Sequence, residues 1–151
     1  MTQPTLSASP ALPGSLAAIQ EDFLALGVKD RLQLLLEFSQ GLPDLPARYA
    51  EHPELLEPVP ECQSPISVFV EVDGDHVRFF ASAPPGAPTS RGFAAILAEG
   101  LDGLTTAEVL AIPADFPHTL GLDEAVTPLR LRGMDALLAR AQRQVRERRA
   151  A

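Results

Sequence analysis

The sequence is poor in the residues from which metal centres and covalent cross-links are built. Its 151 residues include one cysteine and three histidines, and tryptophan is absent. A single cysteine excludes an intrachain disulfide, and it excludes zinc or iron–sulfur sites built on several thiolates. The sequence also has no glycine-rich phosphate or dinucleotide motif. The residues therefore predict neither a metal site nor a bound cofactor.

Positive charge is also scarce. The sequence has 12 Lys and Arg residues against 20 Asp and Glu residues, which gives a net charge of -8. Phosphate backbones require clustered cations, so nucleic acid is not an expected partner. No apolar run approaches the ~20 residues needed to span a bilayer. The first basic residue is Lys29, whereas signal and transit peptides are basic near their start. We therefore expect a cytoplasmic protein that does not use the membrane.

The composition is that of a globular protein, with 46% hydrophobic and 21% charged residues. Residues 1–14 contain three prolines and no periodic pattern, so we expect a flexible N-terminal tail followed by a single domain over 15–149. Apolar residues at helical spacing, together with capping residues, predict several helices. They are expected from Ser15, as the N-cap, to Gly27, then over 29–40 as an antiparallel partner of the first, over 90–100, over 106–111, and from Arg132 onward.

One hairpin is predicted clearly. Residues 66–72 alternate apolar and polar side chains, residues 73–75 (Asp-Gly-Asp) form a turn, and 77–81 continue the apolar face. A hairpin alone is marginally stable and needs a covering layer, which the helices can supply. The fold class is therefore α+β, a small antiparallel sheet packed by helices.

The segment from Pro43 to Pro65 holds six of the fifteen prolines, so it is neither a long helix nor a central strand. At most it contains a helical turn near residues 47–51. Connections this long in a compact domain are usually functional or disordered. Cys62 lies near its end, between Glu61 and Gln63, where the chain enters the first hairpin strand. That context leaves two interpretations open, a buried packing cysteine and a reactive thiol.

The surroundings of Cys62 limit its chemistry. A cysteine hydrolase needs a positioned base, but His52, His76 and His118 are scattered, and His76 is expected in solvent at the hairpin turn. Residues 44–75 contain eight acids and one base, and nearby negative charge disfavours the thiolate. We therefore favour a thiol that is modified and passes the modification on, with a partner supplying cationic surroundings. The alternatives are a redox-active single-thiol protein and a non-catalytic binding module with a structural cysteine.

Several blocks of sequence resemble the SufE family of sulfur-acceptor proteins. The similarity covers about residues 15–145 and is carried by these blocks, in this order: Phe38-Ser39-Gln40-Gly41-Leu42-Pro43-Asp44-Leu45-Pro46, Cys62-Gln63-Ser64, Arg91-Gly92-Phe93-Ala94-Ala95-Ile96-Leu97, Gly103-Leu104-Thr105-Thr106-Ala107-Glu108-Val109-Leu110, Leu120-Gly121-Leu122 and Thr127-Pro128-Leu129-Arg130-Leu131-Arg132-Gly133-Met134. The resemblance implies a SufE/IscU-like fold, with an additional short strand near Val59.

The resemblance also implies a function. Such proteins take persulfide sulfur from a cysteine desulfurase that uses pyridoxal phosphate (PLP), stimulate that enzyme, and hand the sulfur on for iron–sulfur cluster assembly. Cys62 would be the acceptor, and PLP would belong to the partner. The implied partners are a SufS-type or paralogous desulfurase and a downstream iron–sulfur scaffold complex. The chain would be an accessory sulfur-transfer protein and not itself an enzyme.

The resemblance assigns supporting roles near Cys62. Gln63 and Ser64 would set the shape of the loop. Arg130 would meet the partner or hold the loop, unless it forms an ordinary ion pair. Glu61 stands where the family usually has glycine, and it would be strained if this position required a positive φ. We further expect Cys62 to be shielded by apolar neighbours in the free protein and the loop to swing out on docking.

Overall fold

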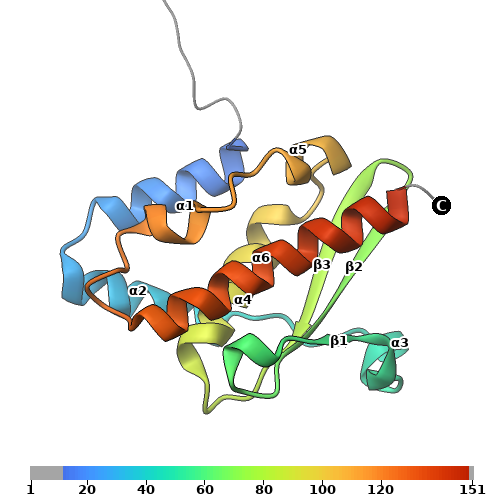
Figure 1. Ribbon diagram of the computed structural model, residues 1–151, viewed down its shortest axis with the longest axis horizontal. Helices are drawn as coiled ribbons and strands as arrows, with labels where there is room; N and C mark the ends of the chain where they lie inside the picture. The colour runs from blue at the N-terminus through green and yellow to red at the C-terminus, as the bar shows by residue number, and fades with distance from the viewer. Residues whose placement is uncertain (1–11, 150–151) are drawn as a thin grey trace, which may run out of the picture.

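The computed structural model describes residues 12–149 (Figure 1). Most of the predicted tail lies outside the described residues, but Leu12 packs against the core and Pro13 is buried. In chain order the elements are α1 (Gly14–Leu24), α2 (Val28–Gln40), α3 (Ala47–Ala50), η2 (Pro53–Leu55), β1 (Glu57–Pro58), η3 (Pro60–Cys62), β2 (Ser67–Asp73), β3 (His76–Ser82), α4 (Pro88–Leu101), α5 (Thr106–Leu110), η4 (Phe116–Leu120) and α6 (Pro128–Arg149).

Within residues 12–149 the sheet has three antiparallel strands in the order β1-β2-β3, which confirms the predicted α+β class and the hairpin. In the hairpin register, Val70 pairs with Phe79 and Phe69 pairs with Phe80. Because side chains alternate along a strand, the first pair faces the helices and the second faces away. The expected extra strand near Val59 is present as β1, which ends one residue earlier.

Helices α4 and α6 cover the apolar face of the hairpin, α4 against β3 and α6 against β2. In Figure 1 α6 runs diagonally in front of the other elements, and α1 and α2 lie at the left, away from the strands. The expected antiparallel pairing of α1 with α2 is not the main contact, because both helices pack chiefly on α4. Gly92 allows the backbones of α4 and α2 to approach closely: a Cβ atom there would lie 2.5 Å from the carbonyl oxygen of Leu35 in α2.

The predicted starts of α1 and α6 were wrong, and a proline lies at each observed start, as the N-cap of α1 and as the first residue of α6. Ser15 is not an N-cap, because α1 begins at Gly14 after Pro13, and the Ser15 hydroxyl instead donates to the carbonyl of Gly100 at 2.7 Å. Helix α6 begins at Pro128, four residues before the predicted start at Arg132. Proline is well suited to the first turn, where a backbone N–H has no helical acceptor. As a result, Ser15 belongs to α1, and residues 128–131 belong to α6.

The part of the β2 edge that β1 leaves unpaired is covered by a side chain of α6. Strand β1 pairs only with the start of β2, and beyond it the buried Gln144 accepts a hydrogen bond from the N–H of Val70 at 2.8 Å. Its amide nitrogen donates to Glu57 of β1 at 2.9 Å. Gln144 therefore joins β1, β2 and α6. Among the helices of residues 12–149, none is long and apolar enough to cross a membrane.

Candidate functional site

Cys62 lies on a short loop that is tied at its base. The N–H of Val59 donates to the carbonyl of Ile66 at 2.8 Å, and both side chains are buried. Residues 60–65, here called the cysteine loop, project from this base. The loop opens with the 3-10 turn η3, in which the N–H of Cys62 donates to Val59 at 3.1 Å. The cysteine therefore ends an irregular turn and does not belong to a long helix or a central strand.

A left-handed residue follows the cysteine. Gln63 has φ 55° and ψ 21°, and it is the only non-glycine residue of 12–149 with a positive φ. Glu61 lies within η3, so the strain considered for a glutamate at that position falls on Gln63 instead. The Ser64 carbonyl accepts a hydrogen bond from Ile66 at 2.7 Å. These backbone contacts turn the chain from η3 into β2.

The sulfur of Cys62 is buried although its loop is not. Cys62 is 4% exposed, whereas Glu61, Gln63 and Pro65 are exposed. The thiol donates to the carbonyl of Gly133 in α6 at 3.5 Å. The expected shielding in the free protein is therefore observed, and α6 supplies much of it. The sulfur therefore lies beneath a turn whose neighbouring residues are at the surface.

The environment keeps the thiol protonated. Burial raises the pKa of Cys62 above its usual value of 9.0, and the Glu61 carboxylate adds to this effect. A contact with the Ser90 side chain and the charges of Arg140 and Arg130 act in the opposite direction, but burial dominates. The nucleophilic form of a cysteine is the thiolate. With its side chain buried in this way, Cys62 is a poor nucleophile at neutral pH.

Arg130 lies on the exposed first turn of α6. Its backbone N–H donates to the Thr127 hydroxyl at 3.3 Å, and its guanidinium has no ion-pair partner among residues 12–149. Its charge lowers the pKa of Cys62, which places it within electrostatic reach of the sulfur. The arrangement leaves the guanidinium free to meet another molecule beside the cysteine loop.

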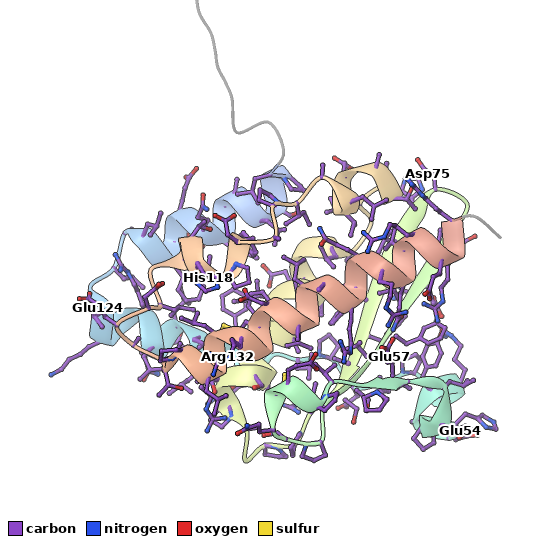
Figure 2. All side chains as sticks on the ribbon, viewed as in Figure 1. Glu54, Glu57, Asp75, His118, Glu124 and Arg132 are labelled. Atoms are coloured by element: carbon purple, nitrogen blue, oxygen red, sulfur yellow. The ribbon has the colours of Figure 1, made fainter. Side chains whose placement is uncertain are left out.

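Arg140 is a site residue that the sequence did not reveal. Its guanidinium lies 2.9 Å from a carboxylate oxygen of Glu61 and 3.3 Å from one of Glu57, and it donates to the carbonyl of Pro58 at 3.3 Å. Figure 2 shows Glu57 beside α6, with Arg132 near the start of the same helix. Glu61 and Arg140 are 79 positions apart, so only the fold brings them together.

The histidines do not assemble around the cysteine. His52 pairs with Glu54, His118 pairs with Asp135, and His76 is exposed at the start of β3. Among residues 12–149 none of the three hydrogen-bonds to Cys62. No group of three or more His, Cys, Asp or Glu side chains in that range is arranged to hold a metal ion. Among the described residues, Cys62 is therefore a single buried thiol with no adjacent histidine base.

Comparison with known proteins agrees with this geometry. The family model described as "SufE: Fe-S metabolism associated domain" matches residues 17–145. Uncharacterised SufE-like proteins from two strains of Mycobacterium tuberculosis are each 50% identical over 143 residues, which cover 94% of this chain and 99% of the relative. A SufE-like protein of Synechocystis is 28% identical over 127 residues, covering 83% of this chain and 77% of its own length.

A solved structure shares the fold. The solution structure of a hypothetical protein from Thermus thermophilus superposes with a TM-score of 0.81 at 40% identity, covering 93% of this chain and 99% of that one. Family match, relatives and fold therefore agree over nearly the whole described chain. The protein belongs to the SufE family and has a role in iron–sulfur metabolism.

Proposed function

We propose that this protein is an accessory sulfur carrier in which Cys62 accepts persulfide sulfur from a PLP-dependent cysteine desulfurase. It stimulates that enzyme and delivers the sulfur to an iron–sulfur scaffold complex in the cytoplasm. The proposed partner is a SufS-type desulfurase, which brings the PLP, and the chain itself is not an enzyme. The observation that carries the proposal is the place of Cys62: the single cysteine of a SufE-family chain lies on an exposed loop.

The transfer needs no added oxidant or reductant. The Cys62 thiol loses its proton, and the thiolate attacks the outer sulfur of the donor persulfide. The donor S–S bond breaks, and its electron pair leaves with the enzyme's thiolate, which takes up a proton. One S–S bond has formed on Cys62 as another has broken on the donor. Delivery to the scaffold repeats the same exchange with Cys62 as the leaving group.

The burial of Cys62 supports a partner-dependent reaction. A buried thiol with a raised pKa attacks slowly at neutral pH, and a persulfide in the same place would be shielded from reductants. Activation therefore falls to the docked complex, in which the cysteine loop moves out and the partner supplies cationic surroundings. Arg130, on the exposed start of α6, contributes to docking, and the backbone turn at Gln63 and Ser64 sets the loop's shape.

Stimulation of the desulfurase tests the proposal. Alanine release from free cysteine would be measured with the desulfurase alone, with the wild-type chain and with Cys62→Ser. We expect the wild-type chain to accelerate release and Cys62→Ser to lose that acceleration. Thermal unfolding of Cys62→Ser would establish that the variant is folded. Equal acceleration by both proteins would contradict a covalent role for the thiol.

One observation favours a second candidate, a binding module with a structural cysteine. Cys62 is only 4% exposed, as packing cysteines usually are. In that case Cys62→Ser would lower stability and leave the effect on the partner intact. A redox-active thiol is less well supported, because burial raises the pKa of Cys62 and disfavours a reactive thiolate. A redox-active thiol protein would also show thiol redox activity in the absence of a desulfurase.

A further inference from the structure

Three oxygen acceptors on the segment leading to Cys62 converge on one arginine of α6. Arg140 contacts the carboxylates of Glu57 and Glu61 and the carbonyl of Pro58. Glu57 and Pro58 form β1, at the base of the cysteine loop, and Glu61 precedes Cys62. A planar guanidinium with five donors suits such a set of acceptors. The arginine side chain is only 21% exposed, so the contact is partly shielded from solvent.

The contacts of Arg140 are not equivalent. Glu57 is also held by Arg143 and by Gln144, both on α6, so β1 stays attached without Arg140. Glu61, in contrast, has its one ion pair within residues 12–149 with Arg140. Arg140 therefore provides the side-chain link between the cysteine loop and the helix that covers the sulfur. Besides the direct packing of Cys62 on Gly133, the other hydrogen bond between the loop and α6 within residues 12–149 is the weak one from the Cys62 thiol to the Gly133 carbonyl.

We propose that Arg140 is a positioning residue that clasps the cysteine loop onto α6 through Glu61 and so sets how often Cys62 becomes accessible. The inference builds on the proposed function, since a docking partner must break this ion pair before sulfur can reach the thiol. Glu61 is 46% exposed, so a charged side chain of the partner can compete for either member of the pair. Screening by salt would weaken the clasp in the same way.

The charge of Arg140 and its ion pair with Glu61 have opposite expected effects on the labelling rate of Cys62. The positive charges of both Arg140 and Arg130 lower the pKa of Cys62. Removing either charge therefore leaves less thiolate and, by this effect alone, slows alkylation at a fixed pH. Arg140 also holds the loop closed, whereas the Arg130 side chain makes no ion pair within residues 12–149. Arg130 is thus a matched control that shares the electrostatic effect but lacks the clasp.

The test measures iodoacetamide labelling of Cys62 in the free, full-length protein. We expect Arg140→Gln to be labelled faster than wild type by about twofold to fivefold, which corresponds to the loss of one partly exposed ion pair. Arg130→Gln should be labelled more slowly. Arg140→Lys, which keeps the charge, should fall between wild type and Arg140→Gln. In a Glu61→Gln background, Arg140→Gln should no longer speed labelling and should slow it as Arg130→Gln does, because the clasp is already broken and only the charge effect remains.

Hydrogen exchange separates local opening from general loosening. Exchange of the Cys62 and Gln63 amides should accelerate in Arg140→Gln, while exchange of the Val77 amide, which bonds to Leu104 in the core, should not change. Slower labelling of Arg140→Gln, as for Arg130→Gln, would overturn the proposal, because the arginine would then act only through its charge. Faster exchange at Val77 as well as in the loop would also overturn it.

These measurements use no desulfurase. Failure of sulfur transfer to Cys62 would therefore remove the proposed function and leave the clasp standing. An unchanged labelling rate in Arg140→Gln would remove the clasp and leave the proposed function standing. The two claims are thus tested separately.

Discussion

Gly133 of α6 lies directly against Cys62, and a Cβ atom at Gly133 would stand 3.2 Å from both the Cα and the sulfur of the cysteine. Such a contact is tighter than most contacts of real Cβ atoms, so a side chain at this position would require the cysteine loop to shift by a few tenths of an ångström. The carbonyl of Gly133 also accepts a hydrogen bond from the Cys62 thiol, at 3.5 Å. The burial of Cys62 therefore depends on position 133 of α6 having no side chain.

Gly133→Ala should push the cysteine loop away from α6. The added methyl group must displace the Cys62 backbone or sulfur, so we expect faster labelling of Cys62 by iodoacetamide. The stability should change little, because alanine in a helix gains about 0.5–1 kcal/mol over glycine and offsets the lost contact. Gly14→Ala, at a helical glycine with no atom near its Cβ position, is the matched control. Identical labelling of wild type and Gly133→Ala would show that the contact does not restrict the loop.

Gln144→Ala should destabilise the whole protein. The substitution leaves the buried N–H of Val70 without an acceptor and removes the donor to Glu57. An unsatisfied buried group costs about 1–3 kcal/mol, so the free energy of unfolding in urea should fall by about that amount. Gln33→Ala, at an exposed position of α2, should change it little. A loss no larger than that of the control would mean that solvent replaces Gln144 at the β2 edge.

The pair of His118 with Asp135 predicts a pH-dependent contribution to stability. The hydrogen bond to Asp135 raises the pKa of His118 above its usual value of 6.5. A pKa raised on folding stabilises the protein below the unfolded value, and this stabilisation is lost as the pH rises through the folded value. His118→Gln should therefore lower the thermal midpoint more at about pH 5 than at about pH 9.

The double variant provides the control for this pair. In an Asp135→Asn background, the effect of His118→Gln should differ much less between the two pH values, because the main group that raises the pKa of His118 is missing and only the weaker charges of Asp123 and Asp115 remain. A pH difference that survives in full in that background would place its cause elsewhere in the molecule.

Arg130→Gln should weaken the action of the protein on its desulfurase without changing its fold. Arg130 is exposed and lies one turn before Gly133, where α6 contacts Cys62, so loss of its charge should raise the concentration needed for half-maximal stimulation. Thermal unfolding should be unchanged. Arg146→Gln, at an exposed position near the far end of α6, should leave stimulation as it was. Equal stimulation by Arg130→Gln and wild type would remove Arg130 from the docking surface.

Local patterns were sufficient to predict several elements. The alternation over residues 66–72 predicted the hairpin, and the capping box of Thr105 with Glu108 predicted α5. The stripe formed by Met134, Leu137 and Val145 predicted the buried face of α6. In each case the signal and the structure it specifies lie within a few residues of one another. The place of Cys62 at a loop leading into the first hairpin strand was also predictable for that reason.

The contacts that control Cys62 were not predictable from local patterns. The pairing of Arg140 with Glu61 joins residues 79 positions apart, and no local pattern marks either of them as a partner of the other. Gly133 has no sequence signature that distinguishes a close approach from a tolerated helix glycine. The edge role of Gln144 depends on where β1 ends. All three arise from tertiary packing between segments that are far apart in the sequence.

Mass spectrometry of the intact chain after incubation with a cysteine desulfurase and free cysteine tests the sulfur-carrier account most directly. The account predicts that wild type gains one sulfur atom, that the gain maps to Cys62, that a thiol reductant removes it, and that Cys62→Ser gains none. A wild-type chain that stays at its original mass while the desulfurase carries its own persulfide would contradict the account.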